Sequence, residues 1–327
     1  MNRVLIALAA AALMGSGCAY IGGPLPPLAN VPGPIANLAA IQRDARIIVQ
    51  FTPPALTTEG MAIKKPLTFD LRIGPAAAPF NIAEWAEQAR QEPSVAAVNG
   101  NVRYEIPSAA WTGKEVTIAV RAIGANGKES GWSIPLVLPV VAPPQVPTGL
   151  HAEATAAGVR LTWGGPGSRF RIFRREPGSE KFDPVTTVTG HDWVDPLSEF
   201  GKTYIYEVQA LVDIGEGKEA ESELTAPVTI TPVDTFPPAV PAGLRAAVAP
   251  NSIELAWDRN TESDLAGYRI YRAEGSGAFA KIAEGSQIPN YSDRTIERGK
   301  TYRYTVIAVD QAGNESARAE PVEVSVP

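Results

Sequence analysis

The chain has 327 residues, a net charge of −6, 45% hydrophobic residues and 20% charged residues. This length can hold two or three domains that each bury a core, and the composition is that of a globular protein. The acidic balance, with no run of Lys or Arg longer than two, argues against a nucleic-acid partner. The only cysteine is Cys18, so the chain cannot form an intrachain disulfide.

The N-terminal residues have the pattern of an export signal. Arg3 supplies a positive charge, and the apolar segment from Val4 to Met14 follows it. As a helix this segment would be about 16 Å long at 1.5 Å per residue, which is too short for a hydrocarbon core of about 30 Å. We therefore expect residues 1–17 to be a signal peptide rather than a transmembrane anchor.

Cys18 directly follows the small residues Gly15 to Gly17. This arrangement resembles the lipobox of bacterial lipoproteins, although Gly15 stands where the pattern prefers Leu. The resemblance implies a lipid on Cys18 and an exported, membrane-anchored protein, in the outer membrane of a Gram-negative cell because Ala19 follows. Cleavage without lipidation is the alternative, and it would give a secreted or periplasmic soluble protein. Residues 18–33, rich in Pro and Gly, are expected to form a tether.

A long sequence motif occurs twice in the second half of the chain. Trp193-Val-Asp195 and the segment Gly201 to Tyr206 recur as Tyr291-Ser-Asp293 and the segment Gly299 to Tyr304, with every position shifted by 98. A repeat of about one hundred residues, made of short alternating segments, is typical of tandem β-sandwiches. The pattern predicts one domain over residues 143–233 and another over residues 234–327.

The expected strands of these two domains also correspond. Apolar and polar residues alternate in Val159–Trp163 and Ser252–Trp257, and again in Phe170–Phe173 and Gly267–Arg272. The proline-led opening, the Trp of the second strand and the Gly-Lys-Thr-Tyr corner together resemble fibronectin type III domains. The resemblance implies immunoglobulin-like sandwiches with four aromatic residues in their structural core: Trp163, Tyr204, Trp257 and Tyr302.

Residues 34–142 are expected to form a divergent copy of the same domain. Gly113 lies 186 positions before Gly299, but Phe51 stands in place of the strand tryptophan and Val116 in place of the corner tyrosine. This domain also carries about twenty extra residues, in which Asn81–Arg90 predicts a short helix capped by Asn81. The predicted fold is all-β, with three tandem immunoglobulin-like (fibronectin type III) β-sandwiches, the first with a short helical insertion.

The expected helix has an apolar face that includes Trp85. An isolated helix of this length is marginal in water, so we expect it to pack onto its own sandwich and to cover an edge strand. The alternative is that the helix is a partner-specific surface. Trp111 and Trp132 have no counterpart in the other repeats. Trp85, Trp111 and Trp132 are therefore the candidate partner-binding residues.

The sequence contains no recognisable catalytic or cofactor motif. His151 and His191 have no Cys or second His at metal spacing, and neither a nucleophile motif nor a phosphate-binding loop occurs. The carboxylates of Asp258–Asp264 could attract calcium, but their spacing departs from the known loop pattern. We therefore expect a protein that is not an enzyme, with no catalytic residue, no metal and no cofactor.

These observations together predict a non-enzymatic, exported and lipid-anchored envelope protein. It would act as an adhesion, scaffold or protein-interaction rod, held to the membrane through the lipid on Cys18, with an envelope protein or a polysaccharide as partner. The alternative is an accessory carbohydrate-binding or spacer subunit of an envelope enzyme or secretion complex.

Overall fold

The computed structural model describes residues 30–76 and 80–327. The predicted signal peptide, Cys18 and most of the predicted tether lie outside the described residues. Two compact units are present: Arg46–Val140 with the residues up to Ile41, and Val141–Pro327 with the short segment Gln42–Ala45. No helix in the described ranges has the length and apolar character needed to cross a membrane.

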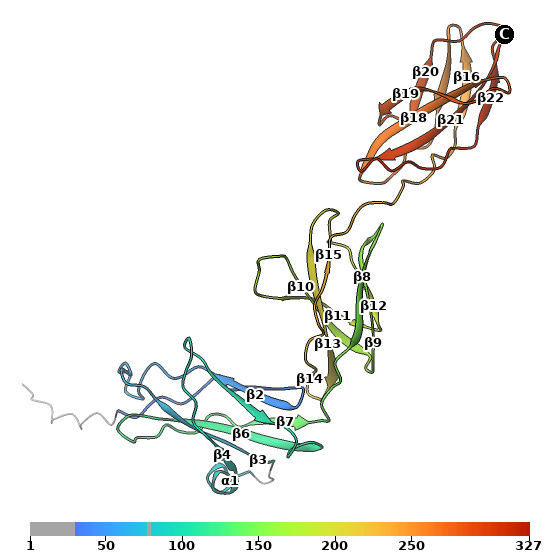
Figure 1. Cartoon of the computed structure of the whole chain (residues 1–327). Helices are drawn as coiled ribbons and strands as arrows, with labels where there is room; N and C mark the ends of the chain where they lie inside the picture. The colour runs from blue at the N-terminus through green and yellow to red at the C-terminus, as the bar shows by residue number, and fades with distance from the viewer. Residues whose placement is uncertain (1–29, 77–79) are drawn as a thin grey trace, which may run out of the picture. The chain divides into compact units, whose positions relative to one another are not determined.

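The first unit consists of two sheets and one short helix (Figure 1). The strands have the order β1-β2-β5 in one sheet and β4-β3-β6-β7 in the other. Every second residue of β5 is buried, as expected for a strand with one face on a core. The elements are β1 (Ala39–Arg43), whose last two residues belong to the second unit, β2 (Arg46–Phe51), β3 (Thr68–Pro75), α1 (Ile82–Gln88), β4 (Arg90–Glu92), β5 (Val102–Pro107), β6 (Lys114–Ile123) and β7 (Leu136–Val140).

The second unit contains two sandwiches, which we call the middle and the third sandwich. The middle sandwich pairs a sheet β12-β9-β8 with a sheet β11-β10-β13, in which β14 and β15 both pair with β13. Its strands are β8 (Thr148–Thr155), β9 (Gly158–Gly164), β10 (Arg169–Arg175), β11 (Asp183–Thr189), β12 (Asp192–Asp195), β13 (Tyr204–Asp213), β14 (Glu219–Glu221) and β15 (Val228–Ile230).

The third sandwich is built from the sheets β16-β17-β20 and β19-β18-β21-β22 (Figure 1). Alternation in β17 and β18 directs one set of side chains into the core, as the sequence pattern predicts. Its strands are β16 (Arg245–Ala249), β17 (Ser252–Ala256), β18 (Leu265–Glu274), β19 (Ala280–Ser286), β20 (Asn290–Asp293), β21 (Thr301–Asp310) and β22 (Val322–Ser325).

Each sandwich has its own core, and the same aromatic contact occurs in all three. An aromatic side chain at the second strand packs edge-on against one of the following strand, with ring centroids between 5.0 and 5.4 Å apart. The pairs are Phe51–Phe69, Trp163–Phe170 and Trp257–Tyr268. Phe51 therefore takes the place of the tryptophan in the divergent copy, as the comparison of the repeats predicts.

A glycine in a left-handed conformation precedes the long strand β6, β13 or β21 of each sandwich. The three glycines are Gly113, Gly201 and Gly299, with φ of 78°, 79° and 81°. Each N–H donates a hydrogen bond to a carbonyl at the end of its domain, and the acceptors are Val140, Pro232 and Val326. A residue with a Cβ atom is strained at such a φ, so this corner accounts for the shared glycine of all three copies.

The helix α1 lies on the first sandwich. The side chain of Asn81 accepts a hydrogen bond from the N–H of Ala83 at 3.0 Å and so caps the helix as predicted. Trp85 and its apolar neighbours pack against Ala119 of β6, and α1 also contacts β3. The prediction that the helix covers its own sandwich is thus confirmed. The helix contacts β3 rather than the predicted edge strand, because β3 is second from the edge of its sheet. The edge strand is β4, which begins two residues after the helix ends.

Candidate functional site

A buried aspartate ends the first part of the repeated sequence motif in each sandwich of the second unit. Asp293 of β20 is 0% exposed and accepts hydrogen bonds from the hydroxyl of Tyr304 and the guanidinium of Arg272, both at 2.8 Å. The N–H and the hydroxyl of Thr295 donate to the same carboxylate at 2.9 and 2.8 Å. Four donors therefore surround one charge that has no contact with water.

The middle sandwich repeats this network. Asp195 of β12 is 0% exposed and accepts from Tyr206 at 2.8 Å, from Arg174 at 2.7 Å and from the N–H of Leu197 at 3.0 Å. The aspartate lies in one sheet, whereas Arg174 and Tyr206 are directly opposite each other on β10 and β13 of the other sheet. The network thus links the two sheets across the core.

The network shifts the pKa values of its members. Burial alone would raise the pKa of Asp293, but the hydrogen bonds from Thr295, Tyr304 and Arg272 outweigh burial and hold it below its usual range. Burial and the bond to Asp293 raise the pKa of Tyr304 far above its usual range. Burial lowers the pKa of Arg272, but the bond and charge of Asp293 give it a net rise. The aspartate is therefore held as an anion and the tyrosine as a neutral hydroxyl.

The predicted core residues lie beside this network. Tyr204 and Tyr302 are buried, and their hydroxyl oxygens accept hydrogen bonds from the N–H of Glu199 and of Glu297, each at 3.0 Å. Trp163 and Trp257 belong to the hydrophobic cores of the same two sandwiches. In the first sandwich the corner position is the buried Val116, so that corner lacks a hydroxyl acceptor.

The aspartate network is structural rather than catalytic. A catalytic carboxylate needs room for a substrate beside it, whereas Asp195 and Asp293 are enclosed and already accept from the chain's own donors. The motif analysis missed this network, although a signal was present. Arg174, Asp195 and Tyr206 recur 98 positions later as Arg272, Asp293 and Tyr304.

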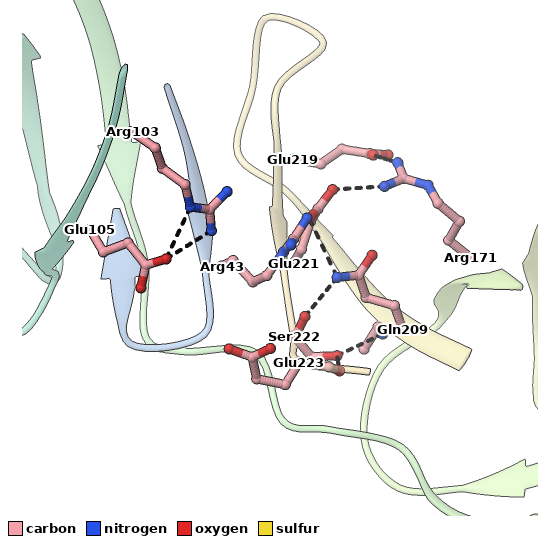
Figure 2. A network of polar contacts seen from close by, with 10 residues as sticks. Arg43, Arg103, Glu105, Arg171, Gln209, Glu219, Glu221, Ser222 and Glu223 are labelled. Atoms are coloured by element: carbon pink, nitrogen blue, oxygen red, sulfur yellow. Dashed lines mark hydrogen bonds and ion pairs between the residues drawn. The ribbon is translucent and has the colours of Figure 1, made fainter. Parts of the chain in front are cut away.

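A second charged cluster in the second unit surrounds Glu221 of β14 (Figure 2). Glu221 is 8% exposed and bonds the guanidinium groups of Arg43 and Arg171, both at 2.7 Å. Arg171 also bonds Glu219 at 2.6 Å, and the amide of Gln209 donates to the carbonyl of Ser222 at 2.8 Å. The arginines thus compensate the charges of both glutamates.

The structure separates the three tryptophans that the sequence singles out. Trp85 is 7% exposed, and its indole N–H donates to the carbonyl of Pro75 at 3.0 Å. Trp132 is half-buried beside it, with the guanidinium of Arg121 4.5 Å from its ring centroid. Trp111 is half-buried elsewhere, with the guanidinium of Arg90 5.6 Å from its ring centroid. These side chains do not combine into one exposed aromatic platform.

The two histidines lie in separate surroundings. His191 is exposed, its Nε2 is 2.9 Å from the carbonyl oxygen of Gly165, and its ring packs on Phe170 with centroids 4.9 Å apart. His151 is exposed on β8. Neither belongs to a group of potential metal ligands among the described residues.

Three carboxylates from separate segments of the second unit do meet, those of Asp234, Asp264 and Asp310, with ligand oxygens within 4.8 Å of one another. Oxygen donors of this kind suit a hard cation. The amide of Asn314 donates to Asp234 at 3.4 Å and to Asp310 at 2.8 Å, which supplies hydrogen bonds to two of the three carboxylates but no positive charge. Of the predicted carboxylate loop, only Asp264 takes part.

The sandwiches of two facing β-sheets, the tyrosine corner repeated in the middle and third sandwiches and their buried aspartate define the class of protein. The chain is built from tandem fibronectin type III-like, immunoglobulin-like β-sandwich domains. No protein-family model matches the sequence. Among solved structures, the FN1–FN3 domains of chicken CNTN1 are similar over 90% of this chain and 99% of that chain, with 14% identity and a TM-score of 0.29.

Short regions of several bacterial enzymes are similar in sequence. Exoglucanase B of Cellulomonas fimi is 31% identical over 189 residues, which are 56% of this chain and 16% of that enzyme. Endoglucanase B of the same organism is 32% identical over 187 residues, 52% of this chain and 17% of the enzyme. Chitinase A1 of Niallia circulans is 33% identical over 107 residues, 32% of this chain and 14% of the enzyme. The chain thus spans less than a fifth of the length of these relatives.

Proposed function

We propose that the protein is a non-catalytic accessory subunit that serves an exported enzyme acting on polysaccharide. One observation carries the proposal: the chain is similar to a small part of enzymes whose names denote different polysaccharides, glucan and chitin. A segment common to such enzymes, and covering 14–17% of each, is better suited to spacing or interaction than to a substrate-specific reaction. The enclosed positions of Asp195 and Asp293 argue against a catalytic role of these two carboxylates.

The experiment is depletion and reconstitution. An envelope or secreted extract of the native cell is depleted of this protein with an antibody, and the release of reducing sugar from glucan and chitin is measured before and after. We expect depletion to lower hydrolysis and the purified chain to restore it, while the purified chain alone releases no sugar. Hydrolysis by the purified chain alone, or an extract unaffected by depletion, would refute the accessory role.

Export and lipid attachment at Cys18 belong to the same proposal, because an accessory subunit has to reach the compartment of its enzyme. The apolar segment Val4–Met14 and the single cysteine after Gly17 support it. The mass and first residue of the mature protein provide the test. An acylated Cys18 in the membrane fraction is the expected result, whereas an unmodified N-terminus in the soluble fraction would contradict the anchor.

The adhesion or scaffold role expected from the sequence is the second candidate. It rests on the tandem sandwiches themselves, because loops and sheet edges of such domains are common interaction surfaces. The similarity to parts of enzymes that are named for glucan and chitin favours the accessory role over the adhesion or scaffold role.

A further inference from the structure

The third sandwich has a hollow at the end that carries the β16–β17 turn and the segment between β20 and β21. Its volume is about 580 Å³, which is within the range of small-ligand sites. Two arginines, Arg294 and Arg298, line it together with the apolar side chains of Val248, Pro250 and Ile296. The hollow therefore combines two positive charges with a few apolar side chains in a lining that is mostly polar.

Neither arginine forms a direct ion pair. Both are exposed, and no ion pair or hydrogen bond of Arg294 or Arg298 occurs among the described residues, although Arg294 lies close enough to Glu254 to lower the pKa of that carboxyl. The nearby carboxylates have other hydrogen-bond partners. Glu297 bonds Lys300 at 3.0 Å, and Glu254 accepts from the hydroxyls of Ser252 and Ser292 at 2.5 and 2.7 Å. The N–H donors of both guanidinium groups are thus available to a ligand, and the charge of Arg294 is shared with Glu254.

The other two sandwiches lack this charge. The positions that correspond to Arg294 and Arg298 are Pro196 and Phe200 in the middle sandwich, and Ser108 and Thr112 in the first. In the middle sandwich, Phe200 instead stacks on Phe236, with ring centroids 6.1 Å apart. The hollow with two cations is therefore a property of the third sandwich and not a requirement of the fold.

We propose that this hollow is a binding site for an acidic sugar residue, namely the uronate of a carboxylated polysaccharide. A guanidinium group matches a carboxylate through paired N–H donors, and the apolar side chains of the lining can contact the C–H face of a sugar ring. A uronate residue offers both features in one unit. The inference goes beyond the proposed function, because the glucan and chitin that the relatives' names denote carry no carboxylate and a uronate polymer is a further ligand.

Charge sets the expected behaviour of this site. The whole chain has a net charge of −6, so long-range attraction does not draw a polyanion to it, and binding has to come from short-range contacts with the two arginines. Neutral polysaccharides should not bind at this hollow.

The test is affinity electrophoresis of the mature full-length protein in native gels that contain polygalacturonate. Parallel gels contain hydroxyethyl cellulose as a neutral polymer and dextran sulfate as a sulfated polymer. The variant is Arg294→Gln with Arg298→Gln, and the matched control is Arg259→Gln, an exposed arginine of the same sandwich that lies outside the hollow and has no partner among the described residues. Thermal unfolding of each variant checks that it folds.

We expect polygalacturonate to retard the wild type and the Arg259 variant equally, and the apparent affinity of the double variant to fall by about tenfold or more, as for the loss of two charge-assisted contacts. Equal retardation of the double variant, no retardation of the wild type, or equal retardation by dextran sulfate would each overturn the uronate site. If depletion lowers hydrolysis while polygalacturonate does not bind, the accessory role stands and this site is wrong. If polygalacturonate binds while depletion leaves hydrolysis unchanged, this site stands and the accessory role is wrong.

Discussion

Replacement of Asp293 by Ala is the most direct test of the network that links the two sheets of the third sandwich. The substitution removes the acceptor of four hydrogen bonds at 2.8–2.9 Å. It leaves the buried hydroxyl of Tyr304 unpaired and the cation of Arg272 without its anion. Removal of one partner from a buried ion pair usually costs about 3–5 kcal/mol.

The side chain of Arg272 decides where in this range the cost lies. It is 23% exposed and also donates to the carbonyl of Thr295 at 3.0 Å, so water and the backbone recover part of the lost interaction. We therefore expect about 3 kcal/mol for Asp293→Ala, which is a change of about two orders of magnitude in the unfolding equilibrium. Asp293→Asn keeps the shape and should cost less, about 1–3 kcal/mol.

Hydrogen exchange of the full-length protein, read by mass spectrometry, measures this free energy for one sandwich at a time. The amides of β21 should exchange about one hundredfold faster in Asp293→Ala, while those of β13 in the middle sandwich should keep their wild-type rate. Asp195→Ala is the matched variant and should reverse the pattern.

A double variant tests the reason for the cost. In the background Arg272→Met no cation is left unpaired, so the further change Asp293→Ala should cost clearly less than it does alone. A loss below about 1 kcal/mol for the single variant, or equal losses in both backgrounds, would refute the reasoning that an uncompensated buried charge is the source of the effect.

Other predictions concern acid, the corner, the helix and a turn. Because the folded pKa of Asp293 is lowered, its contribution to the free energy of unfolding is present above the unfolded pKa of about 3.9 and is lost as pH falls through the folded value. Calorimetry from pH 5 to 2 should therefore show a steeper loss of stability in the wild type than in Asp293→Asn. Equal slopes would contradict this prediction. Tyr302→Phe should cost about 1 kcal/mol in urea unfolding, and an unchanged midpoint would show that its hydroxyl contributes nothing. Trp85→Ala should cost the first unit about 3–5 kcal/mol and expose α1 to protease, whereas unaltered proteolysis would mean that other contacts hold the helix. Gly158→Ala should destabilise the middle sandwich by more than 1 kcal/mol, since its Cβ would collide with the carbonyl oxygen of Asp195, and a wild-type melting temperature would contradict that.

The fold could be predicted because local patterns carry it. Alternation marks β9 and β17, and the glycine before each long strand recurs at matching positions in all three copies. The capped helix after Asn81 could be read in the same way. What local patterns did not give is the docking site of the helix on β3 and β6, because that depends on which strand the inserted residues add to the sheet.

The candidate sites depend on contacts between distant segments, and these are not encoded in spacing. The cluster of Asp234, Asp264 and Asp310 draws one residue from each of three segments. The hollow beside Arg294 and Arg298 becomes visible only when two turns lie side by side. The aspartate network is an intermediate case, since its members repeat at the same offset but their meeting across the core requires the fold.

The link between the sheets also bears on where the protein can fold. Many immunoglobulin-like domains hold their sheets together with a disulfide, which requires an oxidant and an oxidising compartment. Here Asp195 and Asp293 connect the sheets through hydrogen bonds and ion pairs, and the sequences of these two sandwiches contain no cysteine. The middle and third sandwiches should therefore form equally well in reducing and oxidising surroundings. After denaturation they should recover without any thiol chemistry.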